Sequence, residues 1–142
     1  MTPFGKRLRE LREERGVTQK EMAQALRVSP AYLSALEHGR RGQPTWDLLQ
    51  RIITYFNIIW DEAEELQNLA AVSHPRVVID TSGLSPQATQ LANLLAKNIR
   101  LIDRDTIKHL TEEIAAARKR AVGASRFRRM IRKAPSARRA WN

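Results

Sequence analysis

Residue types that carry out enzymatic chemistry are sparse in this sequence. There is no cysteine, and the three histidines, His38, His74 and His109, stand alone and at no metal-ligand spacing. The sequence has no glycine-rich phosphate loop and no serine nucleophile motif. We therefore expect no catalytic residue, no metal and no cofactor, and we expect the protein not to be an enzyme. The abundant chemical group is instead the positive charge of lysine and arginine.

Basic residues outnumber acidic residues and are unevenly distributed. The 25 lysines and arginines and the 15 aspartates and glutamates give a net charge of +10 over 142 residues. Residues 118–142 hold ten basic residues and no acidic one, so residues 1–117 are neutral overall. Within that part, residues 1–60 carry a net charge of +4 and residues 61–117 carry −4. This asymmetry favours a polyanionic partner such as nucleic acid.

The apolar content limits the class of protein. Hydrophobic residues make up 42% of the chain, which is enough for one core. No apolar run approaches the ~20 residues of a membrane span, and the charged start MTPFGKRLREL lacks a secretory signal. We expect no membrane partner and a cytoplasmic, nucleoid-associated protein of a prokaryote or phage.

Local signals divide residues 1–72 into five short helices. Each begins with a side chain that can accept a hydrogen bond from a free backbone N–H, and apolar residues then recur at helical spacing. Only about three residues, at 27–29, join the second and third helices, which predicts the sharp crossing of a helix-turn-helix. The expected caps are Thr2, Thr18, Ser29, Thr45 and Asp61.

These features lie in a stretch that resembles a known family. Residues 4–60 resemble the λ-repressor/Cro-type (XRE) DNA-binding domain, and VTQKEMAQALRVSPAYLSALEHGRRGQP carries the resemblance. Ala23 stands where only a small side chain fits between two helices, and Leu33 and Leu36 occupy the apolar positions of the following helix. The resemblance implies a five-helix, all-α domain. The family usually has glycine at the turn, so Arg27 is expected to adopt a positive φ.

The resemblance also implies a DNA-binding surface. The second helix of such a motif enters the major groove, and its N-terminal residues meet base edges. Family members usually carry long amides or basic side chains at the positions of Pro30, Ala31 and Ala35. This chain should therefore make few direct contacts with base edges, and DNA shape should contribute to its sequence specificity. Arg40 and Arg41 are expected to contact phosphates. The predicted DNA-binding set is Gln19, Lys20, Ser29, Ala31, Tyr32, Ser34, Ala35, Arg40 and Arg41.

Two residues of this set and one pair outside it have specific expectations. The family's glutamine at the position of Gln19 contacts phosphate and an adenine edge, although Gln19 could also be a solvated helix-start residue. Tyr32 is either a phosphate donor or a partly packed aromatic residue. Arg12 and Glu37 match positions that form an ion pair in the family, and we expect this structural pair between the first and third helices.

The remainder of the chain predicts a second, smaller module. Residues 73–84 read as an extended linker, with a short strand at 77–79 as an alternative. Residues 85–121 read as a helical hairpin whose apolar face must be covered by the first domain or by another chain. We favour another chain, and hence a homodimer.

Residues 122–142 form a basic tail, which we expect to be partly disordered. The favoured interpretation is a nonspecific electrostatic arm. The spacing of Phe127, Met130 and Ile131 also permits an amphipathic basic helix. An acidic partner, nucleic acid or an anionic membrane face could bind residues 118–142, or this segment could fold back on the acidic residues 61–117.

The sequence thus predicts an all-α protein with a five-helix DNA-binding domain (1–72), a linker (73–84), a hairpin (85–121) and a tail (122–142). We expect a transcriptional regulator that binds double-stranded DNA sequence-specifically, as a dimer on a pseudo-palindromic operator. The alternatives are an antitoxin or phage repressor with the same domain, a nonspecific nucleoid-type DNA-binding protein, and a protein-interaction adaptor.

Overall fold

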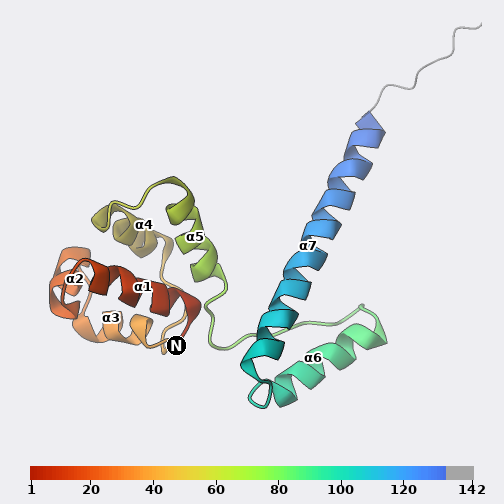
Figure 1. The fold of residues 1–142 in the computed structure, drawn as a ribbon, viewed down its shortest axis with the longest axis horizontal. Helices are drawn as coiled ribbons and strands as arrows, with labels where there is room; N and C mark the ends of the chain where they lie inside the picture. Colours follow the sequence, from red (N-terminus) through yellow and green to blue (C-terminus); the bar gives the residue numbers. More distant parts are fainter. Residues whose placement is uncertain (134–142) are drawn as a thin grey trace, which may run out of the picture. The chain divides into compact units, whose positions relative to one another are not determined.

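The computed structural model describes residues 1–133 and consists of α-helices joined by loops (Figure 1). No strand forms within these residues, so the alternative strand at 77–79 is absent and the expected all-α class is confirmed. The helices are α1 (Pro3–Glu14), α2 (Gln19–Leu26), α3 (Pro30–Glu37), α4 (Trp46–Tyr55), α5 (Trp60–Ala71), α6 (Pro86–Asn98) and α7 (Arg104–Lys133).

The chain divides into two compact units, and the first comprises Met1–Val78. The sequence placed the end of this unit at residue 72, but Ser73 belongs to it. The Ser73 side chain is 1% exposed, accepts a hydrogen bond from the Phe4 backbone N–H at 2.9 Å and donates one to the Leu69 carbonyl. The chain after α5 is therefore fastened to the start of α1.

Side-chain caps explain where most of the helices begin. Thr2, Thr18, Ser29 and Thr45 each accept a hydrogen bond from a backbone N–H of the helix that follows, as expected. Such caps contribute about 1 kcal/mol each. The expectation for Asp61 is wrong.

The helix α5 begins one residue before Asp61. Its N-cap is Ile59, which has no side-chain hydrogen bond, and Asp61 lies inside the first turn. The backbone has a positive φ at Asn57 (51°), in the preceding turn, and at Trp60 (53°), the first residue of the helix. The Asp61 carboxylate therefore acts on the positive end of the helix dipole rather than as a cap.

The hydrophobic core lies entirely within the first unit. The contacts of α1 with α3 and α5, and of α2 with α3 and α4, enclose it. Gly5 allows α1 to approach the end of α3 closely, since a Cβ at this position would collide with the Leu36 carbonyl. The core residues are Phe4, Leu8, Leu11, Met22, Ala23, Leu26, Leu33, Leu36, Leu48, Leu49, Ile52, Phe56, Ile58, Leu66 and Ala70.

The second unit, which begins at Ile79, has no core of its own. None of its described residues is buried, and large apolar side chains such as Leu91 (64% exposed) and Ile114 (65% exposed) remain open to solvent. Within residues 1–133, no helix has both the length and the apolar character to cross a lipid bilayer.

The helix α7 continues further than the sequence interpretation favoured. Residues 122–133 are helical, not an irregular arm, so the amphipathic-helix alternative describes them better. Lysine, arginine and alanine, which are frequent in this part of α7, are good helix formers. The rest of the predicted tail, residues 134–142, lies outside the described residues.

Candidate nucleic-acid interface

The connection between α2 and α3 forms a tight turn around a left-handed residue. Arg27 has φ 57° and ψ 42°, which confirms the positive φ expected where the family usually has glycine. The Val28 N–H donates to the Ala23 carbonyl at 3.0 Å and closes the end of α2. Ala23 is fully buried, so its small side chain allows α2 and α3 to pack closely. A left-handed non-glycine residue costs about 1 kcal/mol, which the surrounding packing must offset.

The helix α3 packs with one side and exposes the other. Leu33 and Leu36 are fully buried against the core. At its start, the Ser29 hydroxyl accepts a hydrogen bond from the Tyr32 N–H at 3.1 Å, which fixes the first turn. Ala31 is exposed, and Tyr32, Ser34 and Ala35 are partly exposed. The residues expected to face DNA therefore do lie on the outer side of α3.

A buried carboxylate connects three helices behind this surface. The Glu37 side chain is 1% exposed, and its Oε1 accepts a hydrogen bond from Arg12 Nε at 2.7 Å. Its Oε2 accepts from Arg12 Nη2 at 3.3 Å and from Gln19 Nε2 at 2.7 Å. Arg12 also donates to the Val17 carbonyl at 3.0 Å. The expected ion pair is thus present, and it holds the start of α2 against α1 and α3.

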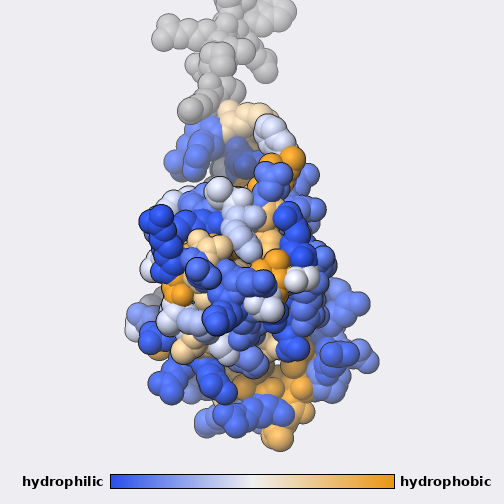
Figure 2. Space-filling model, turned by 90° about the vertical axis from the view of Figure 1, so that its left-hand side faces the viewer, coloured by the Kyte–Doolittle hydropathy of each residue, from blue (hydrophilic) through white to orange (hydrophobic). Residues whose placement is uncertain are grey.

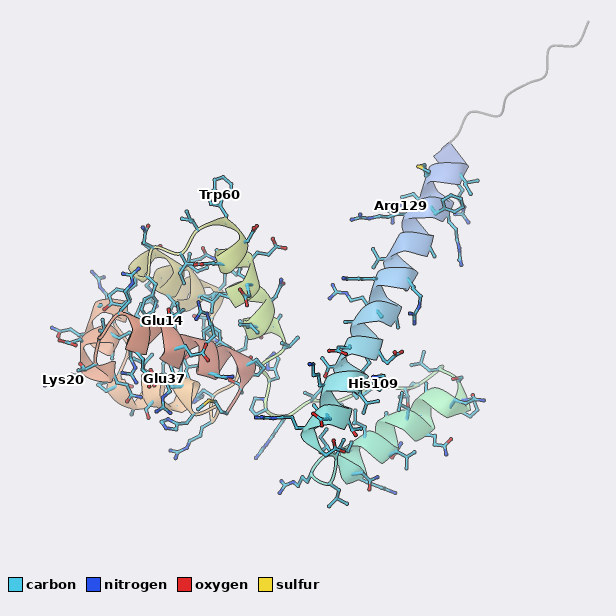
Figure 3. The ribbon with its side chains drawn as sticks, in the orientation of Figure 1. Glu14, Lys20, Glu37, Trp60, His109 and Arg129 are labelled. Atoms are coloured by element: carbon cyan, nitrogen blue, oxygen red, sulfur yellow. The ribbon has the colours of Figure 1, made fainter. Side chains whose placement is uncertain are left out.

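Gln19 Nε2 donates a hydrogen bond to Glu37 at 2.7 Å, so one of its two amide N–H groups is used within the domain. The expected contact of Gln19 with DNA stays a prediction. Gln19 is also the first residue of α2, where backbone N–H groups lack intrahelical partners and favour an anion. The Lys20 side chain beside it is exposed and projects from the outer end of α2 (Figure 3).

The loop after α3 holds two exposed arginines on a fixed backbone. The N–H groups of Arg40 and Arg41 both donate to the Ala35 carbonyl, at 2.9 and 3.1 Å. Gly39 precedes them with φ 72°, and a Cβ there would lie 2.7 Å from the Thr2 backbone nitrogen. Glycine is therefore required at this position. The two guanidinium groups project from a loop that is anchored to α3 and to the N-terminus.

Most side chains on this side of the first unit are hydrophilic. Figure 2 shows the side on which α2 lies, and charged and polar residues cover most of it. Among the described residues, no group of histidine, aspartate and glutamate side chains could hold a metal ion. The geometry thus presents one exposed helix and a basic loop on the same small domain, together with the capped N-terminus of α2.

A comparison with family models decides the class of this domain. The model described as "Helix-turn-helix domain" matches residues 3–66. Residues 3–66 are a helix-turn-helix domain. This agrees with the resemblance to the XRE family, and α2 and α3 are the two helices of the motif.

Curated proteins and solved structures give further likenesses. The HTH-type transcriptional regulator RamB of Mycobacterium tuberculosis is 44% identical over 57 residues, which are 40% of this chain and 12% of RamB. The HTH-type transcriptional repressor RghR of Bacillus subtilis is 27% identical over 114 residues, covering 80% of this chain and 83% of RghR. The solved SinR protein/SinI protein complex aligns with 82% of this chain and 98% of the matched chain, at 16% identity and a TM-score of 0.40.

Sequence reasoning missed two contacts that shape the helix-turn-helix domain. It did not find the Gln19–Glu37 hydrogen bond, because it assigned Gln19 an outward role. It also treated Ser73 as linker, although this hydroxyl accepts a hydrogen bond from the Phe4 N–H in the first turn of α1, 69 positions away, and donates one to the Leu69 carbonyl in the last turn of α5. The capping ability of serine close to the end of α5 was the only local signal for the second contact.

Proposed function

We propose that this protein is a transcriptional regulator that binds double-stranded DNA sequence-specifically through its helix-turn-helix domain. The observation that carries the proposal is the orientation of α3, which buries Leu33 and Leu36 and leaves Ala31, Ser34 and Ala35 accessible. A helix exposed in this way fits the major groove, where its N-terminal residues meet base edges. The likeness to proteins named as transcriptional regulators supports the same role.

The phosphate backbone would be held by groups that flank α3. Arg40 and Arg41 follow it on an anchored loop, and Lys20 projects from α2. The backbone N–H groups at Gln19 add a partial positive charge at the start of α2. Phosphate contacts of this kind set the position of the domain on the duplex but carry no sequence information.

Reading of bases would depend on few side chains. Tyr32 and Ser34 supply hydroxyl groups, whereas Ala31 and Ala35 can only contact a thymine methyl group or allow close approach. Gln19 would contribute its amide oxygen and one N–H, since its other N–H donates to Glu37. We therefore propose that DNA shape contributes a large share of the specificity.

The second unit would join two copies of the chain. It has no buried residue between 79 and 132, so its apolar side chains can be covered by a second copy. A two-fold dimer would hold two copies of α3 about 34 Å apart, which suits a pseudo-palindromic operator. Such a protein would act in the cytoplasm, at the nucleoid, of a prokaryote or in a phage-infected cell.

The basic half of α7, residues 118–133, would provide a second and nonspecific surface for nucleic acid. It holds eight basic residues and no acidic one, and the basic side chains from Arg118 to Arg132 are all exposed. Its contribution would be electrostatic, and so would fall steeply with added salt. An acidic protein that binds the same surface would compete with DNA.

Selection from a library of randomised duplexes tests the proposed function. We expect an enriched pseudo-palindromic motif that binds at least ~10³-fold more tightly than unrelated duplexes. Ser34→Ala should alter the enriched motif, whereas the control Thr54→Ala, on the exposed side of α4, should leave it unchanged. Binding without any sequence preference would assign the protein to the nonspecific, nucleoid-type class, and no binding to duplexes at dilute salt would favour an adaptor.

A further inference from the structure

The helix α7 carries an apolar stripe that has no partner. Its 30 residues span roughly 45 Å, and α6 is not among the helices that pack closely against it. Ile107 is 41% exposed, Leu110 37% and Ile114 65%. The stripe continues through three exposed alanines, Ala117, Ala121 and Ala124.

The spacing of this stripe is that of a coiled coil. Its members are separated alternately by three and four residues, which is the pattern of a and d positions in a heptad repeat. The next position in the series is Arg128, where the apolar stripe ends. We call this stripe, from Ile107 to Ala124, the seam. A second helix of similar length could cover it.

The seam is asymmetric in side-chain size, and this asymmetry selects the direction of the partner. All three large residues lie in its first half and all three alanines in its second half. If the partner is a second α7 running in the opposite direction, Ile107 faces Ala124, Leu110 faces Ala121 and Ile114 faces Ala117 of the second copy. Each layer then combines one large and one small side chain, so the packing is even along the whole seam.

Charges beside the seam favour the same arrangement. Glu113 and Arg120 occupy equivalent flanking positions, so in the antiparallel pair Glu113 of each copy faces Arg120 of the other. Residues 104–117 carry a net charge of −1, and residues 118–133 carry +8. A parallel pair would place the two +8 segments side by side. The antiparallel pair separates the two Arg128 residues by roughly 38 Å, well beyond the screening length in physiological salt.

We propose that two copies of this chain associate through an antiparallel pairing of their α7 helices along residues 107–124. This inference rests on the proposed function, since it names the interface of the proposed dimer. The basic segments 126–133 project beyond the paired region at its two opposite ends. They therefore stay free for a polyanion while the seam is closed.

The absence of cysteine allows a direct test of the pairing by disulfide cross-linking. Two full-length single variants, Ile107→Cys and Ala124→Cys, are co-refolded and oxidised. In the antiparallel pair the two variants should cross-link with each other, because positions 107 and 124 face across the seam. Neither variant should cross-link with itself, because its two cysteines would lie roughly 25 Å apart, far beyond disulfide reach.

Other cross-linking results would overturn the antiparallel pairing. They also distinguish a wrong interface from the absence of a dimer. Cross-links within each single variant, but not between them, would indicate a parallel pair. No cross-link in a protein that sediments as a dimer would place the interface elsewhere, for instance on α6, and leave the proposed regulator intact. A protein that sediments as a monomer at tens of micromolar would refute both this interface and the proposed dimer.

A charge exchange gives a second and independent readout. Glu113→Arg should weaken dimerisation about tenfold, since it places two arginines opposite each other twice per dimer. Adding Arg120→Glu in the same chain should restore the dimer, because the opposite charges face each other again. Failure of the double variant to recover, measured by sedimentation equilibrium, would exclude the proposed alignment.

Discussion

Arg12 of α1 binds Glu37 of α3 through two guanidinium hydrogen bonds, at 2.7 and 3.3 Å, although the carboxylate is 1% exposed. Gln19 of α2 completes the shell of this carboxylate. The pair therefore joins the three helices that position the proposed DNA-binding surface. Its role is orientation, because a buried ion pair contributes little net stability compared with apolar residues of similar volume.

Removing one partner of this pair should destabilise the domain. Arg12→Leu leaves a buried and uncompensated carboxylate, and we expect a loss of about 3 kcal/mol in the free energy of unfolding. Adding Glu37→Leu should recover a large part of this loss. Urea denaturation followed by circular dichroism measures both changes. Arg9→Ala is the matched control, since its partner Glu13 is exposed, and it should unfold like the wild type. A double variant no more stable than Arg12→Leu would contradict this account.

Backbone strain at Arg27 predicts a substitution that stabilises the domain, in contrast to Arg12→Leu. Its φ of 57° suits glycine, so Arg27→Gly should stabilise the domain by about 0.5–1 kcal/mol. Gly16 has a similar φ of 63° with open space around it, and Gly16→Ala should destabilise the domain by about 1 kcal/mol. Thermal unfolding of the two variants should therefore shift in opposite directions. Destabilisation by Arg27→Gly would show that the arginine side chain contributes more than the turn conformation costs.

The first unit was largely predictable because its signals are local. Thr18 and Glu21 form their capping box within one turn, and Ser29-Pro30 fixes the start of α3 without help from distant residues. The apolar face of each helix followed from spacing alone. For this reason the order of the five helices and the outward side of α3 agree with the structure.

The errors concern contacts between residues far apart in sequence. Gln19 donates a hydrogen bond to Glu37, and Ser73 accepts one from Phe4. The local sequence around Gln19 or Ser73 does not indicate either of these distant partners. The extent of α7 was also missed, since the density of charge in residues 118–133 suggested an unstructured arm. The heptad spacing of Ile107 to Ala124 is present in the sequence, but it indicates a coiled coil only if all these residues lie on one continuous helix.

The basic loop after α3 should contribute to binding of every duplex alike. Replacing both Arg40 and Arg41 by alanine should weaken binding to all sequences by a similar factor and reduce the salt slope by about 2, near one unit per phosphate contact. Fluorescence anisotropy at several salt concentrations measures this slope. Lys6→Ala with Arg9→Ala removes the same charge from α1 and should change the slope less. A selective loss of one operator would instead assign Arg40 or Arg41 to base reading.

The capping box of α2 should make stability depend on pH in the acidic range. Hydrogen bonds from the Thr18 backbone N–H and hydroxyl group hold the pKa of Glu21 below its ordinary value. Because the folded pKa is lowered, this contribution is complete above the ordinary pKa of glutamate. It is lost as the pH falls through the lowered value.

Glu21→Gln should therefore unfold at a lower temperature than the wild type near neutral pH, and this difference should shrink as the pH falls below about 4. Thermal unfolding across the acidic range measures it, with Glu64→Gln on the exposed side of α5 as a control for the loss of one negative charge. A wild-type advantage over Glu21→Gln that persists unchanged in acid would mean that the charged carboxylate does not stabilise the start of α2. In that case the Thr18 hydroxyl alone would fix the helix start that positions Gln19 beside Glu37.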